Sequence, residues 1–83
     1  MYRVRIERKA RKKLARIPDP HYSNIKKAIL NLGDNPRPPS CKKLKGRDAF
    51  RIRIGNYRVI YEISDKELIV DVVTLGHRKD VYE

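Results

Sequence analysis

The sequence predicts a single α+β domain over residues 1–83, with a small, mainly antiparallel four-stranded sheet and an N-terminal helical hairpin packed on one face. Three observations predict this fold. Apolar and charged residues alternate with a period of two over residues 1–6 and 50–54, as in strands with one buried face. Helix-forming residues with apolar side chains at helical spacing follow the first of these strands. The most continuously apolar run, residues 68–75, predicts a strand inside the sheet.

Length and charge limit the classes of function. The 83 residues include 21 Lys and Arg against 10 Asp and Glu, a formal net charge of +11. So basic a domain favours a polyanionic partner, most often nucleic acid. A membrane surface is the alternative, but no long amphipathic segment with bulky aromatics supports it. No apolar run approaches the ~18 residues of a membrane span, and the charged N-terminus has no signal-like core. We therefore expect a cytoplasmic protein.

Cysteine and histidine are too few for a structural metal site. One cysteine, Cys41, excludes an internal disulfide, and with two histidines it argues against structural zinc. A chain of this length has one modest core and no room for a separate cofactor domain. We expect no metal and no cofactor.

The first predicted helix, residues 7–17, has a thin apolar stripe of Ala10, Leu14 and Ile17. Residues 3–16 hold eight basic side chains and one acid. A merely solvated face is the alternative to a binding face, but this imbalance exceeds what solubility needs. The basic side chains of this helix that we expect to contact RNA are Arg11, Lys12 and Lys13.

The second predicted helix follows Pro18-Asp19-Pro20 and runs to about Leu32. Asp19 is placed to cap it and Pro20 to be its first residue, where a missing N–H costs nothing. Residues 33–49 form a long loop with three prolines, expected to be irregular over most of its length and anchored by Leu44. The buried stripe of the helix is Tyr22, Ile25, Ala28, Ile29 and Leu32, and the loop's expected RNA contacts are Lys42, Lys43, Lys45 and Arg47.

The hairpin after this loop holds the candidate site. Gly55-Asn56 suits a two-residue type II′ turn, which would set Arg53 opposite Arg58. Directly opposed residues share a face, so Arg51, Arg53 and Arg58 should gather on the side away from the core. Like charges opposed across a ladder are destabilising, and phosphate is the obvious anion to relieve them. If Asp65-Lys66 is the next turn, Asp71 faces Ile60 on the same side.

Further candidate residues follow the last strand. If that strand neighbours residues 57–63, its end brings His77 and Arg78 close to Arg58. Arginines around one phosphodiester can stabilise a pentavalent transition state, and RNA carries its own 2′-hydroxyl nucleophile. Tyr82 could stack on a base or donate a proton, and His77 is either structural or the proton-transfer group. Phosphate binding without catalysis stays open.

The chain resembles the RelE family, within the RelE/ParE superfamily of toxin–antitoxin toxins. The resemblance rests on LKG at residues 44–46, FRIRIGNYRVIYE at residues 50–62, the apolar strand after it and the closing GHRKDVY of residues 76–82. It covers essentially the whole chain. It implies a microbial-ribonuclease-like fold, a cognate antitoxin, and metal-independent cleavage of mRNA in the ribosomal A site. The 2′-hydroxyl would attack the adjacent phosphate and leave a 2′,3′-cyclic phosphate.

The resemblance assigns the family's functional residues to Arg51, Arg53, Arg58, Arg78 and Tyr82. Well-known members have lysines where this chain has Arg51 and Arg53, and a lysine can act as a base where arginine hardly can. The gap between Arg78 and Tyr82 is also short compared with some members. Both departures favour His77 as the residue that transfers a proton. Two alternatives remain: ParE-like members share the fold but inhibit DNA gyrase by binding, and a basic RNA-binding module would have no catalytic activity.

Overall fold

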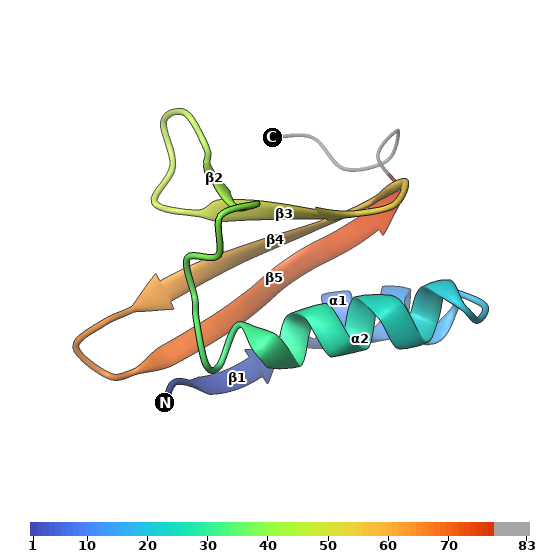
Figure 1. The fold of residues 1–83 in the computed structure, drawn as a ribbon, viewed down its shortest axis with the longest axis horizontal. Helices are drawn as coiled ribbons and strands as arrows, with labels where there is room; N and C mark the ends of the chain where they lie inside the picture. Colours follow the sequence, from blue (N-terminus) through green and yellow to red (C-terminus); the bar gives the residue numbers. More distant parts are fainter. Residues whose placement is uncertain (78–83) are drawn as a thin grey trace.

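The sheet is the centre of the molecule and both helices lie on one side of it (Figure 1). A computed structural model describes residues 1–77. Along the chain the elements are β1 (Arg3–Ile6), α1 (Arg8–Ala15), α2 (His21–Asn31), β2 (Lys42–Lys43), β3 (Phe50–Ile54), β4 (Tyr57–Ser64) and β5 (Ile69–His77).

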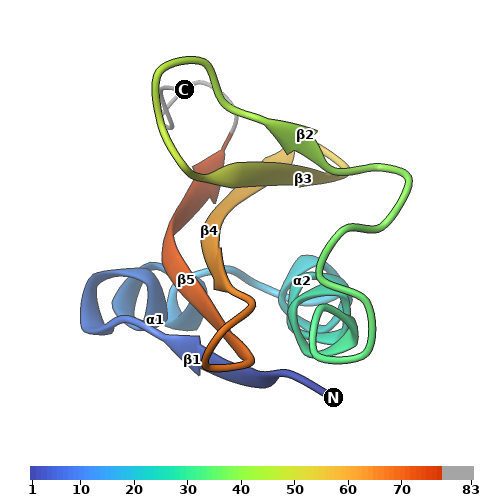
Figure 2. The same ribbon diagram turned by 90° about the vertical axis from the view of Figure 1, so that its left-hand side faces the viewer.

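The sheet has five strands in the order β1-β5-β4-β3-β2. Only β1 and β5 run parallel, so the mainly antiparallel α+β prediction is confirmed. β5 lies between β1 and β4, as its continuous apolar run predicts. The predicted count of four strands was wrong because Lys42–Lys43, within the long loop, pairs with β3. Two residues are too few to show a period of two. In Figure 2, β3 runs across the direction of β5, so the sheet is strongly twisted.

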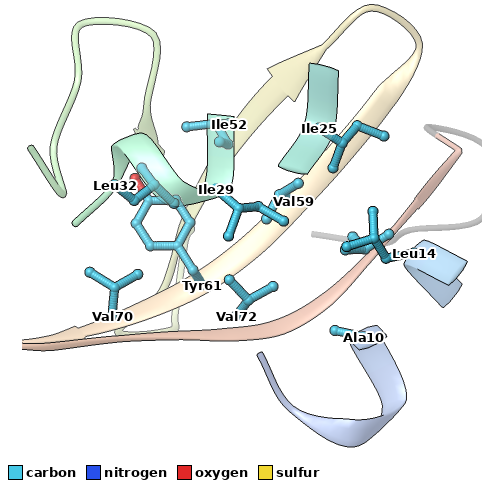
Figure 3. Close-up of a cluster of buried hydrophobic side chains, with 11 residues drawn as sticks. Ala10, Leu14, Ile25, Ile29, Leu32, Ile52, Val59, Tyr61, Val70 and Val72 are labelled. Carbon is cyan, nitrogen blue, oxygen red and sulfur yellow. The ribbon is translucent and has the colours of Figure 1, made fainter. Parts of the chain in front are cut away.

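The main core lies between the helices and the sheet. Ala10 and Leu14 of α1 and Ile25 and Ile29 of α2 are buried against one face, as the predicted stripes require (Figure 3). Tyr22 and Ala28 pack at the margin of this core. The strand residues that complete it are Ile52, Val59, Tyr61, Val70, Val72 and Leu75.

Asp19 lies one residue before the N-cap of α2, which is Pro20 because the helix begins at His21, so the predicted positions of Asp19 and Pro20 are each off by one residue. Its carboxylate Oδ1 accepts hydrogen bonds from the backbone N–H of Ser23 at 3.0 Å and from the Ser23 hydroxyl at 2.6 Å. These hydrogen bonds, first the hydroxyl and then the amide, lower the pKa of Asp19. Pro20 stands just before the helix and ends the turn from α1.

The two hairpins differ in how well their registers are predicted. β3 and β4 pair as the Gly55-Asn56 turn requires, with Arg53 opposite Arg58. Between β4 and β5, however, Ser64 pairs with Ile69, so the loop has four residues, 65–68, instead of two. Asp71 therefore opposes Glu62, and the predicted pairing of Asp71 with Ile60 was wrong. The shift is an even number of residues, so Asp71 stays on the predicted face.

The long loop is held to the far end of the β4–β5 hairpin. Arg37 donates two hydrogen bonds to the Asp65 carboxylate, at 2.8 and 3.1 Å, and its guanidinium lies 5.4 Å from the centre of the Phe50 ring. The Tyr2 hydroxyl donates to the same carboxylate at 2.5 Å. Tyr61 is fully buried, and its hydroxyl donates to the Pro36 carbonyl at 2.7 Å. Within residues 1–77, no helix is long and apolar enough to cross a membrane.

Acid should destabilise the protein partly through Asp65. The hydrogen bonds from Arg37 and then Tyr2 lower the pKa of this carboxyl to about 2, whereas an unfolded Asp has a pKa of ~3.9. The stabilisation is therefore complete above about pH 5 and is lost as the pH falls towards about 2. Thermal unfolding measured against pH should show a steeper acid loss for the wild type than for Asp65→Asn. Parallel curves would contradict this assignment.

Candidate nucleic-acid interface

The three hairpin arginines lie on the sheet face opposite the helices. Arg53 and Arg58 are directly opposed across β3 and β4, which confirms the predicted register, and Arg51 is two residues along the same face. We call this side the arginine face. It also includes the cross-strand neighbours of these residues, so its members are Lys42, Arg51, Arg53, Arg58, Ile60, Thr74 and Gly76.

Strand pairing arranges these residues in two rows across the sheet. The first row consists of Lys42 on β2, Arg51 on β3, Ile60 on β4 and Thr74 on β5. The second row consists of Arg53, Arg58 and Gly76. Residues two apart on a strand are separated by about 7 Å, so the rows are neighbours. The positive charges of three strands therefore converge on one patch.

The arginines differ in exposure because a loop covers part of the first row. Leu44 and Ala49, at the two ends of the loop between β2 and β3, are buried with Ile60 in a second, small cluster. This confirms the predicted anchoring role of Leu44. Arg51 is only 6% exposed, Arg58 is half-buried and Arg53 is exposed. A ligand on this face could therefore contact Arg53 and Arg58 more readily than Arg51.

An acidic row borders the arginine face on the side towards the β4–β5 loop. Glu62 on β4 opposes Asp71 on β5, which in turn opposes Arg5 on β1. Arg5 and Asp71 form an ion pair at 3.3 Å. β5 and its Asp71 carboxylate therefore separate the basic side chains of β1 from the hairpin arginines. A polyanion would be attracted to the two basic rows and repelled by the acidic one.

Only part of the predicted RNA-binding set is tied to the arginine face. Lys42 belongs to the first row, and Lys13 of α1 donates from Nζ to the Thr74 hydroxyl at 3.3 Å. Lys43 opposes Phe50, which packs on the main core, so Lys43 is on the other face. Arg11 donates to the Ile6 carbonyl at 3.2 Å. The remaining members, Lys12, Lys45 and Arg47, are exposed on α1 and on the 44–49 loop.

His77 lies on the helix-covered face. It opposes Tyr57, with ring centres 5.7 Å apart, and Tyr57 is also 5.3 Å from the ring of His21. Gly76 is the residue that opposes Arg58. Side chains alternate between faces along a strand, so His77, the next residue, is on the other face. The expected closeness of His77 to the arginines thus holds for the backbone but not for the side chain. Arg78 and Tyr82 lie outside the described residues.

The sequence predicted Arg53 opposite Arg58 but not the residues that extend the two rows beyond the hairpin. No local pattern indicates that Lys42 pairs with Arg51 or that Lys13 reaches Thr74, because both contacts depend on how separate segments of the chain pack.

Among the described residues, no three His, Cys, Asp or Glu side chains are grouped so as to hold a metal ion.

Toxins of type II toxin–antitoxin systems are similar to this chain over most of its length. A family model described as the ParE toxin of a type II toxin–antitoxin system, parDE, matches residues 4–82. A protein of Escherichia coli named as a RelE-like toxin is 29% identical over 98% of this chain and 90% of its own length. A protein of Methanocaldococcus jannaschii named as toxin RelE1 is 30% identical over 99% of this chain and 96% of its own length.

Solved structures share the fold. The toxin–antitoxin complex RelBE2 of Mycobacterium tuberculosis contains a chain with a TM-score of 0.82 and 28% identity, covering 93% of this chain and 98% of that one. The RelE–RelB complex of Pyrococcus horikoshii contains one with a TM-score of 0.84 and 31% identity, covering 96% and 98%. With the family model spanning almost the whole sequence, these matches identify the chain as a member of the RelE/ParE superfamily of type II toxin–antitoxin toxins.

Proposed function

We propose that this toxin is a ribosome-dependent mRNA endoribonuclease that blocks translation. The observation that carries the proposal is the direct opposition of Arg53 and Arg58 on the sheet face away from the helices, with Arg51 and Lys42 in the adjoining row. Arginine binds phosphate oxygens through a bidentate fork and stays charged at every relevant pH. The similarity to RelE-like toxins supports the same reading.

The chemistry follows from what arginines can do around an RNA phosphodiester. Arg53 and Arg58 would hold the phosphate so that the neighbouring 2′-oxygen lies in line with the leaving 5′-oxygen. As the 2′-oxygen bonds to phosphorus, negative charge grows on the phosphoryl oxygens, and pre-positioned guanidinium groups stabilise it. The products would be a 2′,3′-cyclic phosphate and a 5′-hydroxyl. Arg78 and Tyr82 are proposed, from the resemblance, to complete the site.

Inhibition of DNA gyrase is the second candidate, because the matching family model carries the ParE description. A gyrase inhibitor would act by binding alone and would need the basic surface only for attachment. The arginine rows favour the ribonuclease, since their charges converge on a patch suited to one phosphodiester.

A cognate antitoxin is the proposed partner. Two of the similar solved chains are toxins in complexes with RelB antitoxins. An antitoxin with an acidic segment would complement the arginine face and neutralise part of the +11 net charge. A ribosomal target also makes the cytoplasm the proposed location.

Two assays on the purified wild-type protein separate the candidates. With ribosomes that hold mRNA codons in the A site, primer extension should reveal discrete cuts within codons, and the same RNA without ribosomes should be cut far less. A DNA supercoiling assay with gyrase should be unaffected. Intact mRNA together with inhibited gyrase would overturn the proposal in favour of the second candidate, and no effect in either assay would favour a non-catalytic RNA-binding module.

A further inference from the structure

Cleavage by the 2′-hydroxyl requires a general base, a group that removes the proton of the hydroxyl. On the arginine face this base must be a residue other than arginine. A guanidinium stays protonated, so Arg51, Arg53 and Arg58 can stabilise charge but cannot accept a proton. A lysine amine in its neutral form can do so. Among the described side chains, two lysines are tied to this face, Lys42 and Lys13.

Lys13 reaches the arginine face around an open edge of the sheet. β1 pairs only with residues 69–72 of β5, so the second half of β5 has no strand on that side within the described chain. α1 packs there, with Ala10 and Leu14 in the main core. The Lys13 side chain, half-buried, extends past the edge and donates from Nζ to the Thr74 hydroxyl at 3.3 Å. Thr74 ends the first row of the arginine face.

The hydrogen bond to Thr74 places the nitrogen of Lys13 two residues along β5 from the position opposite Arg58. Thr74 is two residues from Gly76, which opposes Arg58 and has no side chain. The second row therefore presents no β5 side chain between Arg58 and the end of Lys13. A phosphodiester bound by Arg58 would have its ribose within reach of that amine. Lys42 is less suited, because it is exposed at the other end of the row, beyond the buried Arg51.

We propose that Lys13 is the general base of the cleavage reaction, an inference that rests on the endoribonuclease function proposed above. The Lys13 amine takes the proton of the 2′-hydroxyl as the 2′-oxygen bonds to phosphorus. The bond from phosphorus to the 5′-oxygen breaks, and the leaving oxygen takes a proton from water. The resulting hydroxide removes the proton from the Lys13 ammonium, which restores the enzyme. Thr74 is a positioning residue that orients the amine.

Substitution of Lys13 by arginine separates proton transfer from charge. Lys13→Arg keeps the positive charge and a long side chain but cannot act as a base. On ribosome-bound mRNA we expect kcat to fall about 100-fold or more, the usual size of a general-base contribution, with KM almost unchanged. Lys27→Arg is the matched control, since Lys27 is an exposed lysine on α2 that belongs to no predicted binding set, and it should keep the wild-type kcat.

Chemical rescue of a second variant, Lys13→Ala, provides an independent measurement. Adding ethylamine to the Lys13→Ala protein should restore part of the lost rate, because a small free amine can occupy the vacated space and accept the proton. Guanidinium at the same concentration supplies charge without a base and should not restore it. Unchanged thermal unfolding of both variants would show that the loss is not one of folding.

A wild-type kcat in Lys13→Arg, or equal rescue by guanidinium and ethylamine, would overturn the role of Lys13 while leaving the endoribonuclease intact. A wild-type protein that cleaves no mRNA would overturn both proposals. The two failures are therefore distinguishable in the same set of assays.

Discussion

Replacing Arg58 with alanine should lower the rate of mRNA cleavage by about 100- to 1,000-fold, the usual cost of removing one group that stabilises transition-state charge. Arg58 is half-buried in the middle of the second row, with Arg53 opposite on one side and Gly76 on the other. Its loss removes the guanidinium nearest the centre of the patch. Single-turnover cleavage of ribosome-bound mRNA measures the effect directly.

The control for this prediction is Arg16→Ala, which removes an exposed positive charge at the end of α1 without touching the arginine face. It should leave the cleavage rate close to that of the wild type. Arg58→Lys should recover part of the lost rate, because it restores the charge but not the bidentate fork. Equal rates for the wild type and Arg58→Ala would exclude the arginine face as the site of cleavage.

Replacing Tyr61 with alanine should lower the free energy of unfolding by about 3–5 kcal/mol, as for other large buried aromatic residues. The side chain is fully buried at the centre of the main core, and its ring stacks near Phe50 with centroids 5.9 Å apart. Proteins of this kind are stable by only about 5–15 kcal/mol. Urea unfolding followed by circular dichroism should therefore place the variant at the margin of stability.

Tyr61→Phe isolates the contribution of the hydroxyl. That group donates to the Pro36 carbonyl at 2.7 Å, so its removal leaves a loop carbonyl without this partner and should cost about 1–3 kcal/mol. Burial raises the pKa of Tyr61, which keeps the hydroxyl protonated as the donor. Tyr2→Phe, which removes an exposed hydroxyl, is the control and should have a smaller effect. Similar losses for the two variants would contradict the anchoring role of Tyr61.

Local patterns determined the fold class and the centre of the candidate site. The alternation over residues 50–54 separates Phe50 and Ile54 from Arg53, and the two-residue Gly55-Asn56 turn sets Arg53 opposite Arg58. Both signals depend only on a few neighbouring residues, so they can be recognised in the sequence alone. The apolar stripes of the helices are local in the same way.

The tertiary structure decided which other side chains join the arginines. A bulge in the pairing of β4 with β5, at Ile60 and Tyr61, brings Thr74 opposite Ile60, and pairing of β2 brings Lys42 opposite Arg51. Burial of Arg51 depends on a loop that folds back over Ile60. Lys13 reaches Thr74 across 61 residues of sequence only because β1 is shorter than β5. These contacts depend on strand lengths, loop paths and packing between distant segments, for which a single sequence holds no periodic signal.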